Sequence, residues 1–275
     1  RVYLGYKGNI NKYFTAEAKL DIGSPEDLSE YSLIRRYAYF KTAELKYSRE
    51  DLTLHMGLFS MLQYKLQEKT WGYRYLYKSF MDEHKIGPSA DIGLGAEHRF
   101  SEMIKADLVI SNGEGYKNLQ SDNSYKTGAG LTINPFENTT MRLYYDFVKK
   151  GVLQSTISTF ISYSVDKYRL SFEFIEVLNR GFNQERNLYG ISVYGTYIIN
   201  DKWEVFGRYD RLTSNIDKET GIPWNILNDG SALITGVEYG IHENIKLSLN
   251  YRDWYSYAEN GPDKSYIYLN LEFKL

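Results

Sequence analysis

The stretch Lys264-Ser-Tyr-Ile-Tyr-Leu-Asn-Leu-Glu-Phe-Lys-Leu275 alternates apolar and polar side chains to the end of the chain. One face carries Ile267, Leu269, Leu271, Phe273 and Leu275, and the other carries Tyr266, Tyr268, Asn270, Glu272 and Lys274. Alternation over about ten residues is the pattern of a membrane-spanning β-strand. A barrel in the outer membrane ends on such a strand because its last strand closes the ring. The stretch therefore predicts a transmembrane β-barrel.

Composition narrows the choice of class. The 33 Lys+Arg nearly balance the 35 Asp+Glu, so neither nucleic acid nor a uniformly anionic partner is indicated. Cysteine is absent, which excludes disulfides and thiolate metal sites. A mean hydropathy of -0.48, without a long apolar run, excludes transmembrane helices. The chain has 27 Tyr and 13 Phe. Tyrosine is suited to membrane interfaces and pore walls, where one end of the ring is in apolar surroundings and the other in water. A Tyr-rich soluble β-sandwich has the same composition.

Alternation of apolar and polar residues recurs along the chain. It is clear at 14–22, 52–58, 91–99, 104–111, 141–147, 168–174, 203–210 and 245–252, and less regular at 37–47, where Lys41 lies among apolar neighbours. We count about fifteen strands, and single-chain bacterial barrels use even numbers. We therefore expect one further strand upstream of Arg1, and about sixteen strands around an aqueous lumen.

The connections alternate in length. Short ones fall near 9–12, 49–50, 101–102, 135–138, 166–167, 200–201 and 242–244, and long ones at 24–36, 60–89, 113–124, 179–186, 213–229 and 258–263. The exception is 150–152, which is short where a long loop is due. Tight turns on one rim and long loops on the other are typical of bacterial outer-membrane barrels. A β-sandwich has no reason to sort its connections in this way. We predict an all-β fold with one antiparallel barrel domain over 1–275, in the bacterial outer membrane.

The polar faces of these strands carry charges of both signs. If the apolar faces meet lipid, the residues predicted to line the pore are Lys19, Glu97, Arg99, Lys105, Asp107, Arg142, Asp146, Arg169, Glu173, Arg208, Asp210, Glu238 and Arg252. In a packed core so many charges would be prohibitive, whereas around water they are tolerable. The alternative is the solvated face of ordinary sheets, which would need a second sheet over each apolar face. Balanced charges predict weak ion selectivity, and the sign of any preference stays open.

The segment 60–89 is the longest connection. Leu62, Leu66, Tyr73, Leu76 and Phe80 follow helical spacing, broken at Gly72. Four basic residues accompany them, namely Lys65, Lys69, Arg74 and Lys78. Long structured loops in barrels are often functional. The segment either folds into the lumen and constricts the pore, or forms an external lid or partner-binding loop.

Several stretches resemble one family of porins. They are Arg1-Val-Tyr-Leu-Gly-Tyr-Lys-Gly8, Ala18-Lys-Leu-Asp-Ile22, Gln67-Glu-Lys-Thr-Trp-Gly-Tyr-Arg-Tyr75, Ser89-Ala-Asp-Ile-Gly93, Ser111-Asn-Gly-Glu-Gly-Tyr116 and Tyr268-Leu-Asn-Leu-Glu-Phe-Lys-Leu275. This set resembles the porins grouped with the phosphate-selective porins O and P, in their Bacteroidetes-type branch. The resemblance implies a sixteen-stranded outer-membrane barrel, often a homotrimer, that passes small solutes by diffusion. The chain has no lysine ladder that would imply phosphate selectivity, and it ends on Leu275 where the family usually has an aromatic residue.

Two other functions are open to a barrel of this kind. A protease or phospholipase built into a barrel needs a histidine near Asp or Ser, and of His55, His84, His98 and His242 only His55 points inward within a strand. No phosphate-binding Gly-rich loop and no metal-ligand spacing occurs, so neither catalytic residues nor a cofactor or metal are expected. The remaining alternative is a plugged barrel that anchors a larger assembly. We expect a water-filled channel whose partners are outer-membrane lipid and small hydrophilic solutes or ions.

Overall fold

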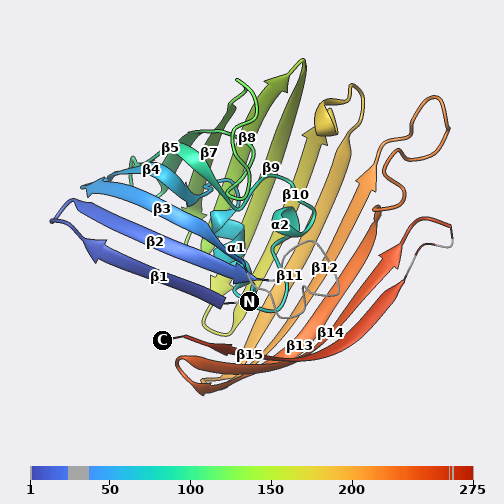
Figure 1. The fold of residues 1–275 in the computed structure, drawn as a ribbon. Coiled ribbons are helices and arrows are strands. Elements are labelled where there is room, and N and C mark those ends of the chain that lie inside the picture. Colours follow the sequence, from blue (N-terminus) through green and yellow to red (C-terminus); the bar gives the residue numbers. More distant parts are fainter. Residues whose placement is uncertain (1, 24–36, 260, 262, 275) are drawn as a thin grey trace.

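The computed structural model describes residues 2–23, 37–259, 261 and 263–274. They form one antiparallel sheet of 15 strands, paired in sequence order (Figure 1). The strands are β1 (Val2–Asn9), β2 (Phe14–Gly23), β3 (Tyr37–Arg49), β4 (Leu52–Ser60), β5 (Ala90–Arg99), β6 (Ile104–Ser111), β7 (Lys126–Phe136), β8 (Thr139–Lys150), β9 (Val152–Val165), β10 (Tyr168–Leu178), β11 (Leu188–Asn200), β12 (Trp203–Ser214), β13 (Gly230–His242), β14 (Ile245–Ser256) and β15 (Lys264–Phe273). Three short helices accompany them: α1 (Lys65–Trp71), α2 (Phe80–Glu83) and the 3-10 helix η1 (Arg180–Phe182). In the described residues, no helix is long and apolar enough to cross a membrane.

The sheet curves around α1 and α2 (Figure 1). Every strand pairs with its neighbour in the chain, and no pairing between β1 and β15 is present among the described residues. The all-β, antiparallel prediction is confirmed, with about the number of strands that the sequence indicates. The described residues do not test the expected sixteenth strand, which stays a prediction.

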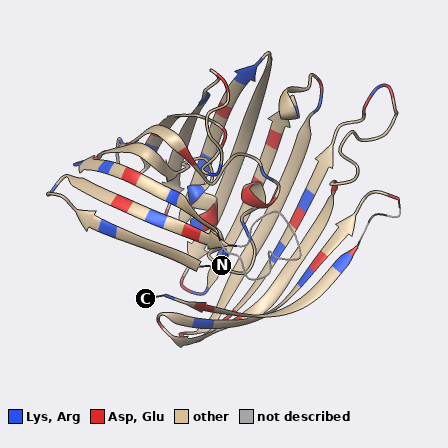
Figure 2. Cartoon of the chain, in the orientation of Figure 1, with Lys and Arg blue, Asp and Glu red and all other residues tan. Residues whose placement is uncertain are grey.

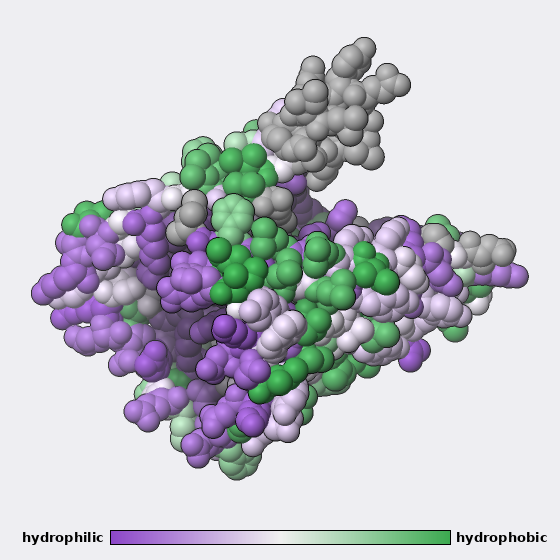
Figure 3. All heavy atoms as spheres, turned by 90° about the horizontal axis from the view of Figure 1, so that it is seen from below, coloured by the Kyte–Doolittle hydropathy of each residue, from purple (hydrophilic) through white to green (hydrophobic). Residues whose placement is uncertain are grey.

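Alternation decides which side chains face outward. On β8, Met141, Leu143, Tyr145 and Phe147 are 38–52% exposed, whereas Arg142, Tyr144, Asp146 and Val148 are 7% exposed or less. Successive side chains of a strand point to opposite faces, so the apolar set covers the outside of the curved sheet. Seen from below, the molecule is hollowed, with hydrophilic residues gathered at the opening (Figure 3). Apolar outside and polar inside is the arrangement of a transmembrane barrel.

The connections follow the predicted order, including the exception. Gly151 alone joins β8 to β9, with a φ of 75° that a glycine adopts without strain. The predicted long connection 24–36 lies outside the described residues. The irregular pattern around Lys41 has a physical cause: the β2–β3 register shifts next to it, since Lys19 pairs with Thr42 but Leu20 pairs with Phe40. Lys41 is therefore the extra residue of a β-bulge.

We expect one inward-facing glycine to be required for packing. A Cβ on Gly128 would lie 2.1 Å from the hydroxyl of Tyr144, a side chain with 0% exposure. Gly128→Val should therefore lower the free energy of unfolding by about 1–3 kcal/mol through overpacking. The measurement is urea unfolding of the detergent-folded protein.

The matched control is Gly207→Val on β12, where an added Cβ meets nothing within 4 Å. This variant should unfold at nearly the wild-type urea concentration. Equal midpoints for the two variants would contradict the packing described here.

Candidate functional site

The segment 61–89, called here the inner loop, folds into the space enclosed by the sheet (Figure 1). Its first helix, α1, ends at Trp71 and is capped by Gly72, which has a φ of 74° and donates its N–H to the Glu68 carbonyl at 3.2 Å. This left-handed glycine cap turns the chain before a second helix, α2. The helical spacing predicted from the sequence is thus only partly right, because two short helices flank the non-helical residues 72–79.

Aromatic side chains dock the inner loop on the wall. Trp71 and Tyr73 are buried against Phe206 of β12, with ring centroids 6.1 and 4.3 Å from it. The same cluster contains Leu76 and residues of β9, β11 and β13, namely Phe160, Tyr194, Ala232 and Ile234. Burying a large apolar side chain contributes roughly 1.5–3 kcal/mol. The cluster therefore holds α1 and the residues after it against β9–β13.

A second apolar cluster holds α2. Phe80, Met81 and Ile86 pack on inward-facing residues of the wall, which are Ile175 and Val177 of β10, Leu188 of β11 and Leu212 of β12. These wall residues are an exception to the polar inner face that the sequence predicts. A signal was present, because residues 174–178 (Phe-Ile-Glu-Val-Leu) carry apolar side chains at both parities. A strand that is apolar on both faces has protein against its inner side.

Hydrogen bonds fix the loop's orientation. Arg142 donates to the Leu62 carbonyl at 2.9 Å, and Arg208 donates to the Lys78 carbonyl at 2.8 Å. Tyr73 donates its hydroxyl to Glu204 at 2.6 Å. Tyr75 does the same to Glu238, also at 2.6 Å. Wall side chains thus provide hydrogen-bond partners for these polar groups of the loop.

His84 follows α2 and packs on Phe80, with ring centroids 4.6 Å apart. Burial lowers the pKa of His84 to about 4, although Asp210 opposes the effect and Arg208 reinforces it. The imidazole is therefore neutral near pH 7. It acts as part of the loop's packing against the wall.

The charged residues predicted to line the pore divide into two groups. Asp107, Arg142, Asp146, Glu173, Arg208, Asp210 and Glu238 are on the inner wall and are buried. Lys19, Glu97, Arg99, Lys105, Arg169 and Arg252 retain contact with solvent. Lysine and arginine occur together with Asp and Glu on the strands at both sides of the sheet (Figure 2). Only the second group borders open space in this conformation.

Most of the buried charges on the wall are paired with an opposite charge, and Glu173 is an exception. Arg142 binds Asp107 in a two-pronged contact, with Nη1–Oδ2 2.6 Å and Nη2–Oδ1 2.9 Å. Arg208 binds Asp210 through Nη2 and Oδ2 at 2.7 Å. Lys126, which the sequence prediction omitted, binds Asp146 at 2.8 Å. Such pairing offsets the cost of removing charges from water.

Most partly exposed wall charges also have partners. Lys19 binds Glu17 at 2.9 Å. Glu97 contacts Lys105 and accepts a hydrogen bond from His55 Nε2 at 2.8 Å, and His55 also contacts Glu44. Arg252 donates to Asn250 and Asn270 at 2.8 and 3.0 Å. Arg169 donates to Thr196 at 3.2 Å, while Arg99 is exposed at the end of β5. His55 is thus held between two carboxylates on the wall.

The four basic residues of the inner loop have different surroundings. Lys65 lies 3.7 Å from Glu97 of β5 and Lys78 lies 3.9 Å from Glu83. Lys69 is exposed. Arg74 is bound by Glu68 at 2.6 Å and by Asp82 at 2.7 Å. The loop therefore presents a mixed surface to the lumen.

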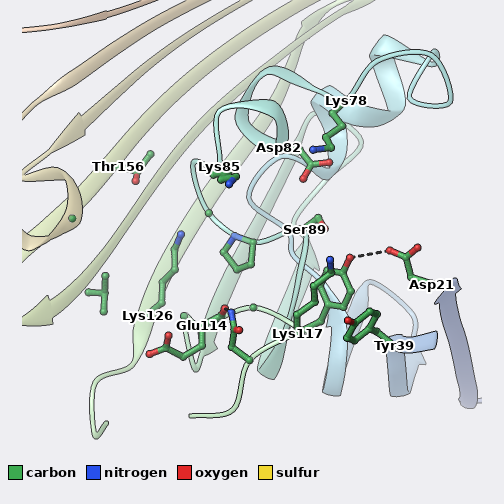
Figure 4. A pocket seen from close by; sticks show the side chains of 18 of the residues that line it. Asp21, Tyr39, Lys78, Asp82, Lys85, Ser89, Glu114, Lys117, Lys126 and Thr156 are labelled. Carbon is green, nitrogen blue, oxygen red and sulfur yellow. Dashed lines mark hydrogen bonds between the residues drawn. The ribbon is translucent and has the colours of Figure 1, made fainter. Parts of the chain in front are cut away.

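A cavity of about 1050 Å³ lies beside the inner loop (Figure 4). The loop contributes Arg74, Lys78, Asp82 and Lys85, and β2 and β3 contribute Asp21 and Tyr39. Residues 113–118 and 180–182, from two of the long connections, also line it. Asp21 accepts a hydrogen bond from Tyr116 at 2.9 Å (Figure 4). The cavity thus opens on the rim that bears the long connections. No group of His, Cys, Asp and Glu that could hold a metal occurs among the described residues.

Comparisons with solved structures identify the fold. OmpF of Salmonella typhi, in a complex with daunomycin, has a TM-score of 0.75 and 12% identity, covering 98% of this chain and 89% of that one. The outer-membrane channel DcaP of Acinetobacter baumannii has a TM-score of 0.64 and 11% identity, covering 98% and 82%. The trimer form of OmpT, an outer-membrane protein of Vibrio cholerae, has a TM-score of 0.59 and 11% identity, covering 98% and 88%. No family model and no curated protein matches the sequence. The chain has the fold of outer-membrane β-barrels.

Removing one arginine should loosen the inner loop. Arg142→Ala leaves Asp107 buried without its partner and frees the Leu62 carbonyl, so we expect a loss of about 3–5 kcal/mol in the free energy of unfolding. Hydrogen exchange of peptides from 61–89 should also become faster. Urea unfolding and hydrogen-exchange mass spectrometry measure the two effects.

Arg99→Ala is the control, because Arg99 is exposed at the end of β5. It should change neither the unfolding midpoint nor the exchange of the inner loop. Unchanged exchange in the Arg142 variant would show that the loop is docked without this arginine.

Proposed function

We propose that this protein is an outer-membrane porin, a water-filled channel for passive diffusion of small hydrophilic solutes or ions. The observation that carries the proposal is the inner loop. It occupies one side of the lumen, on β9–β13, and leaves a cavity of about 1050 Å³ between itself and other parts of the wall. A polar interior narrowed by a folded-in loop suits a diffusion channel, whose selectivity depends on pore diameter and lining charges.

The lining charges favour weak selectivity. Around the cavity, Lys150 is bound by Glu114 at 2.6 Å and by Asp122 at 2.8 Å. Lys126 and Arg74 are paired in the same way. Adjacent carboxylates thus offset part of the excess of basic residues on the cavity wall. Among the residues taken as pore-lining, we infer that Lys19, Glu97, Arg99, Lys105, Arg169 and Arg252 meet solutes, together with Lys65, Lys69, Arg74 and Lys78 of the constriction.

The family assignment is part of the proposal. The stretches that resemble the porins grouped with phosphate-selective porins O and P support membership in their Bacteroidetes-type branch. Their phosphate selectivity is not included, since the basic residues named above lie beside carboxylates and do not form a ladder. Catalysis is not proposed either. His55 is the inward-facing histidine of the strands, and it contacts Glu44 and Glu97 instead of a serine.

A homotrimer is the assembly we infer, and the outer surface favours one face for it. Outward-facing positions of β4, β5 and β6 carry no Phe, Tyr or Trp, but include exposed Leu94 and Leu108 and the small residues Ala96 and Ala106. By contrast, β8–β12 carry exposed outward rings, among them Tyr145, Tyr163, Tyr168, Tyr197 and Trp203. Tyrosine and tryptophan mark surfaces that face lipid, while small residues let two proteins approach closely. We therefore place the contact between copies on β4–β6.

Channel activity is tested by single-channel recording in planar bilayers under a KCl gradient. We expect stepwise openings and a reversal potential near zero, because charges of both signs border the lumen. Lys69→Glu, in the exposed part of the inner loop, should shift the reversal potential toward cation preference. Lys149→Glu, on the outward parity of β8, is the control and should leave it unchanged. A protein that inserts but never conducts would indicate a plugged barrel instead.

The assembly face is tested with one residue in each region. Leu108 of β6 is 62% exposed and Leu170 of β10 is 56% exposed. Leu108→Trp should reduce the fraction of trimers in chemical cross-linking, since the larger ring obstructs close packing between copies. Leu170→Trp should not, because tryptophan is readily accommodated in lipid. Loss of trimers in the Leu170 variant alone would place the contact on the opposite side.

A further inference from the structure

Arg211 lies on the outward face of the wall, near the end of β12 that leads into the long connection 215–229. Its chain neighbours Asp210 and Leu212 are buried on the inner face, whereas Arg211 is exposed. It pairs with Ile191 of β11 and Ser231 of β13. In the order of the sheet, these strands are distant from β4–β6, where we place the contact between copies. In that arrangement, Arg211 faces lipid.

The height of Arg211 in the membrane follows from strand geometry. Trp203 begins β12 at the short-turn rim, and its ring centroid lies 4.6 Å from that of Tyr239, as expected of rings at a membrane interface. Strands rise about 3.3 Å per residue and tilt by about 40°, so Arg211 lies about 20 Å farther along the membrane normal. The apolar band of such barrels is about 25 Å tall. Arg211 is therefore near the outer edge of the hydrocarbon, where its long side chain extends to the headgroups.

The guanidinium of Arg211 has donors but no acceptor. Within the described ranges it makes no ion pair and no side-chain hydrogen bond, and it lies 5.7 Å from the centroid of the Tyr257 ring. Two outward-facing carboxylates near this rim, Glu176 on β10 and Asp253 on β14, are each two strands away. Asp253 accepts a hydrogen bond from Ser265 at 2.7 Å. The positive charge of Arg211 is thus left without a counter-charge from the described wall.

Three hydroxyl groups lie on the same face as Arg211. The Oγ of Ser231 is 2.9 Å from the Tyr209 hydroxyl and also contacts the Tyr257 hydroxyl. These hydroxyls have three protons, and two are used in the hydrogen bonds between them, so one remains to donate to an acceptor outside the group. Together with the guanidinium they form a surface with surplus donors. It is called here the outer patch and consists of Tyr209, Arg211, Ser231 and Tyr257.

We propose that the outer patch binds a phosphate group in the headgroup of an outer-leaflet lipid. The planar guanidinium matches two phosphate oxygens, and the remaining hydroxyl proton adds a further hydrogen bond. The long connections of bacterial barrels are extracellular, which places the patch in the outer leaflet. Next to it toward the membrane centre, outward-facing Leu233 of β13 is 44% exposed and available to acyl chains. A free phosphate ion lacks this apolar contact.

The proposal is tested by native mass spectrometry of the folded protein in detergent micelles that contain phosphorylated lipid A. We expect the wild type to retain the lipid and Arg211→Gln to retain about tenfold less, because charge-assisted hydrogen bonds to phosphate are lost. Lipid A from which the phosphate has been removed should bind weakly to both. Arg211→Lys keeps the charge but loses the planar fork, so its retention should be intermediate.

Arg49→Gln is the matched control. Arg49 is also outward-facing and lies 5.8 Å from the ring centroid of Tyr13, but it is at the short-turn rim and 3.6 Å from Glu50. This variant should retain the lipid as the wild type does. Equal retention by the wild type and Arg211→Gln would overturn the proposal. Displacement of the lipid by an equal concentration of inorganic phosphate would also overturn it, in favour of a general anion site. Neither result bears on the proposed porin function, because no conductance is measured.

Discussion

The constraint on which this structure depends is that backbone amides and carbonyls in hydrocarbon must be hydrogen-bonded within the protein. The ladder from β1 to β15 meets this requirement, because each strand pairs with the next along nearly its whole length. The ladder also imposes alternation, so that each strand presents one face to lipid and the other to the lumen. Both the apolar exterior and the charged interior follow from this single pattern.

The interior then has to accommodate charge next to a folded loop. Under the inner loop, apolar wall residues such as Ile175 and Phe206 pack against the loop's aromatic side chains. Arg142 and Arg208 are paired with carboxylates and also donate hydrogen bonds to carbonyls of the loop. Each arginine thus has a role in both pairing and docking. A loop attached in this way is held as part of the wall, and its position depends on the wall's ion pairs.

The sequence predicted those features that follow from a local rule, applied to one residue after another. Alternation predicted the strands and their outward faces, and the spacing of turn residues predicted which connections are short. It failed where a local pattern depends on distant partners. The bulge at Lys41 became visible only in the pairing with β2. The seven predicted pore-lining residues that are buried, Glu173 among them, have the inward parity expected of them, but parity does not reveal that a loop covers them.

By itself, the sequence determined that this chain is an antiparallel barrel with polar lining, because a period of two residues follows from strand geometry alone. It also indicated a structured segment at 60–89, yet it left open whether that segment lies inside or outside. Only the tertiary structure showed that the segment lies inside. Its position depends on contacts of Trp71 with Phe206 and of Arg74 with Tyr3. The residues of each pair are more than 70 positions apart in the sequence, and they approach each other only after the sheet has curved.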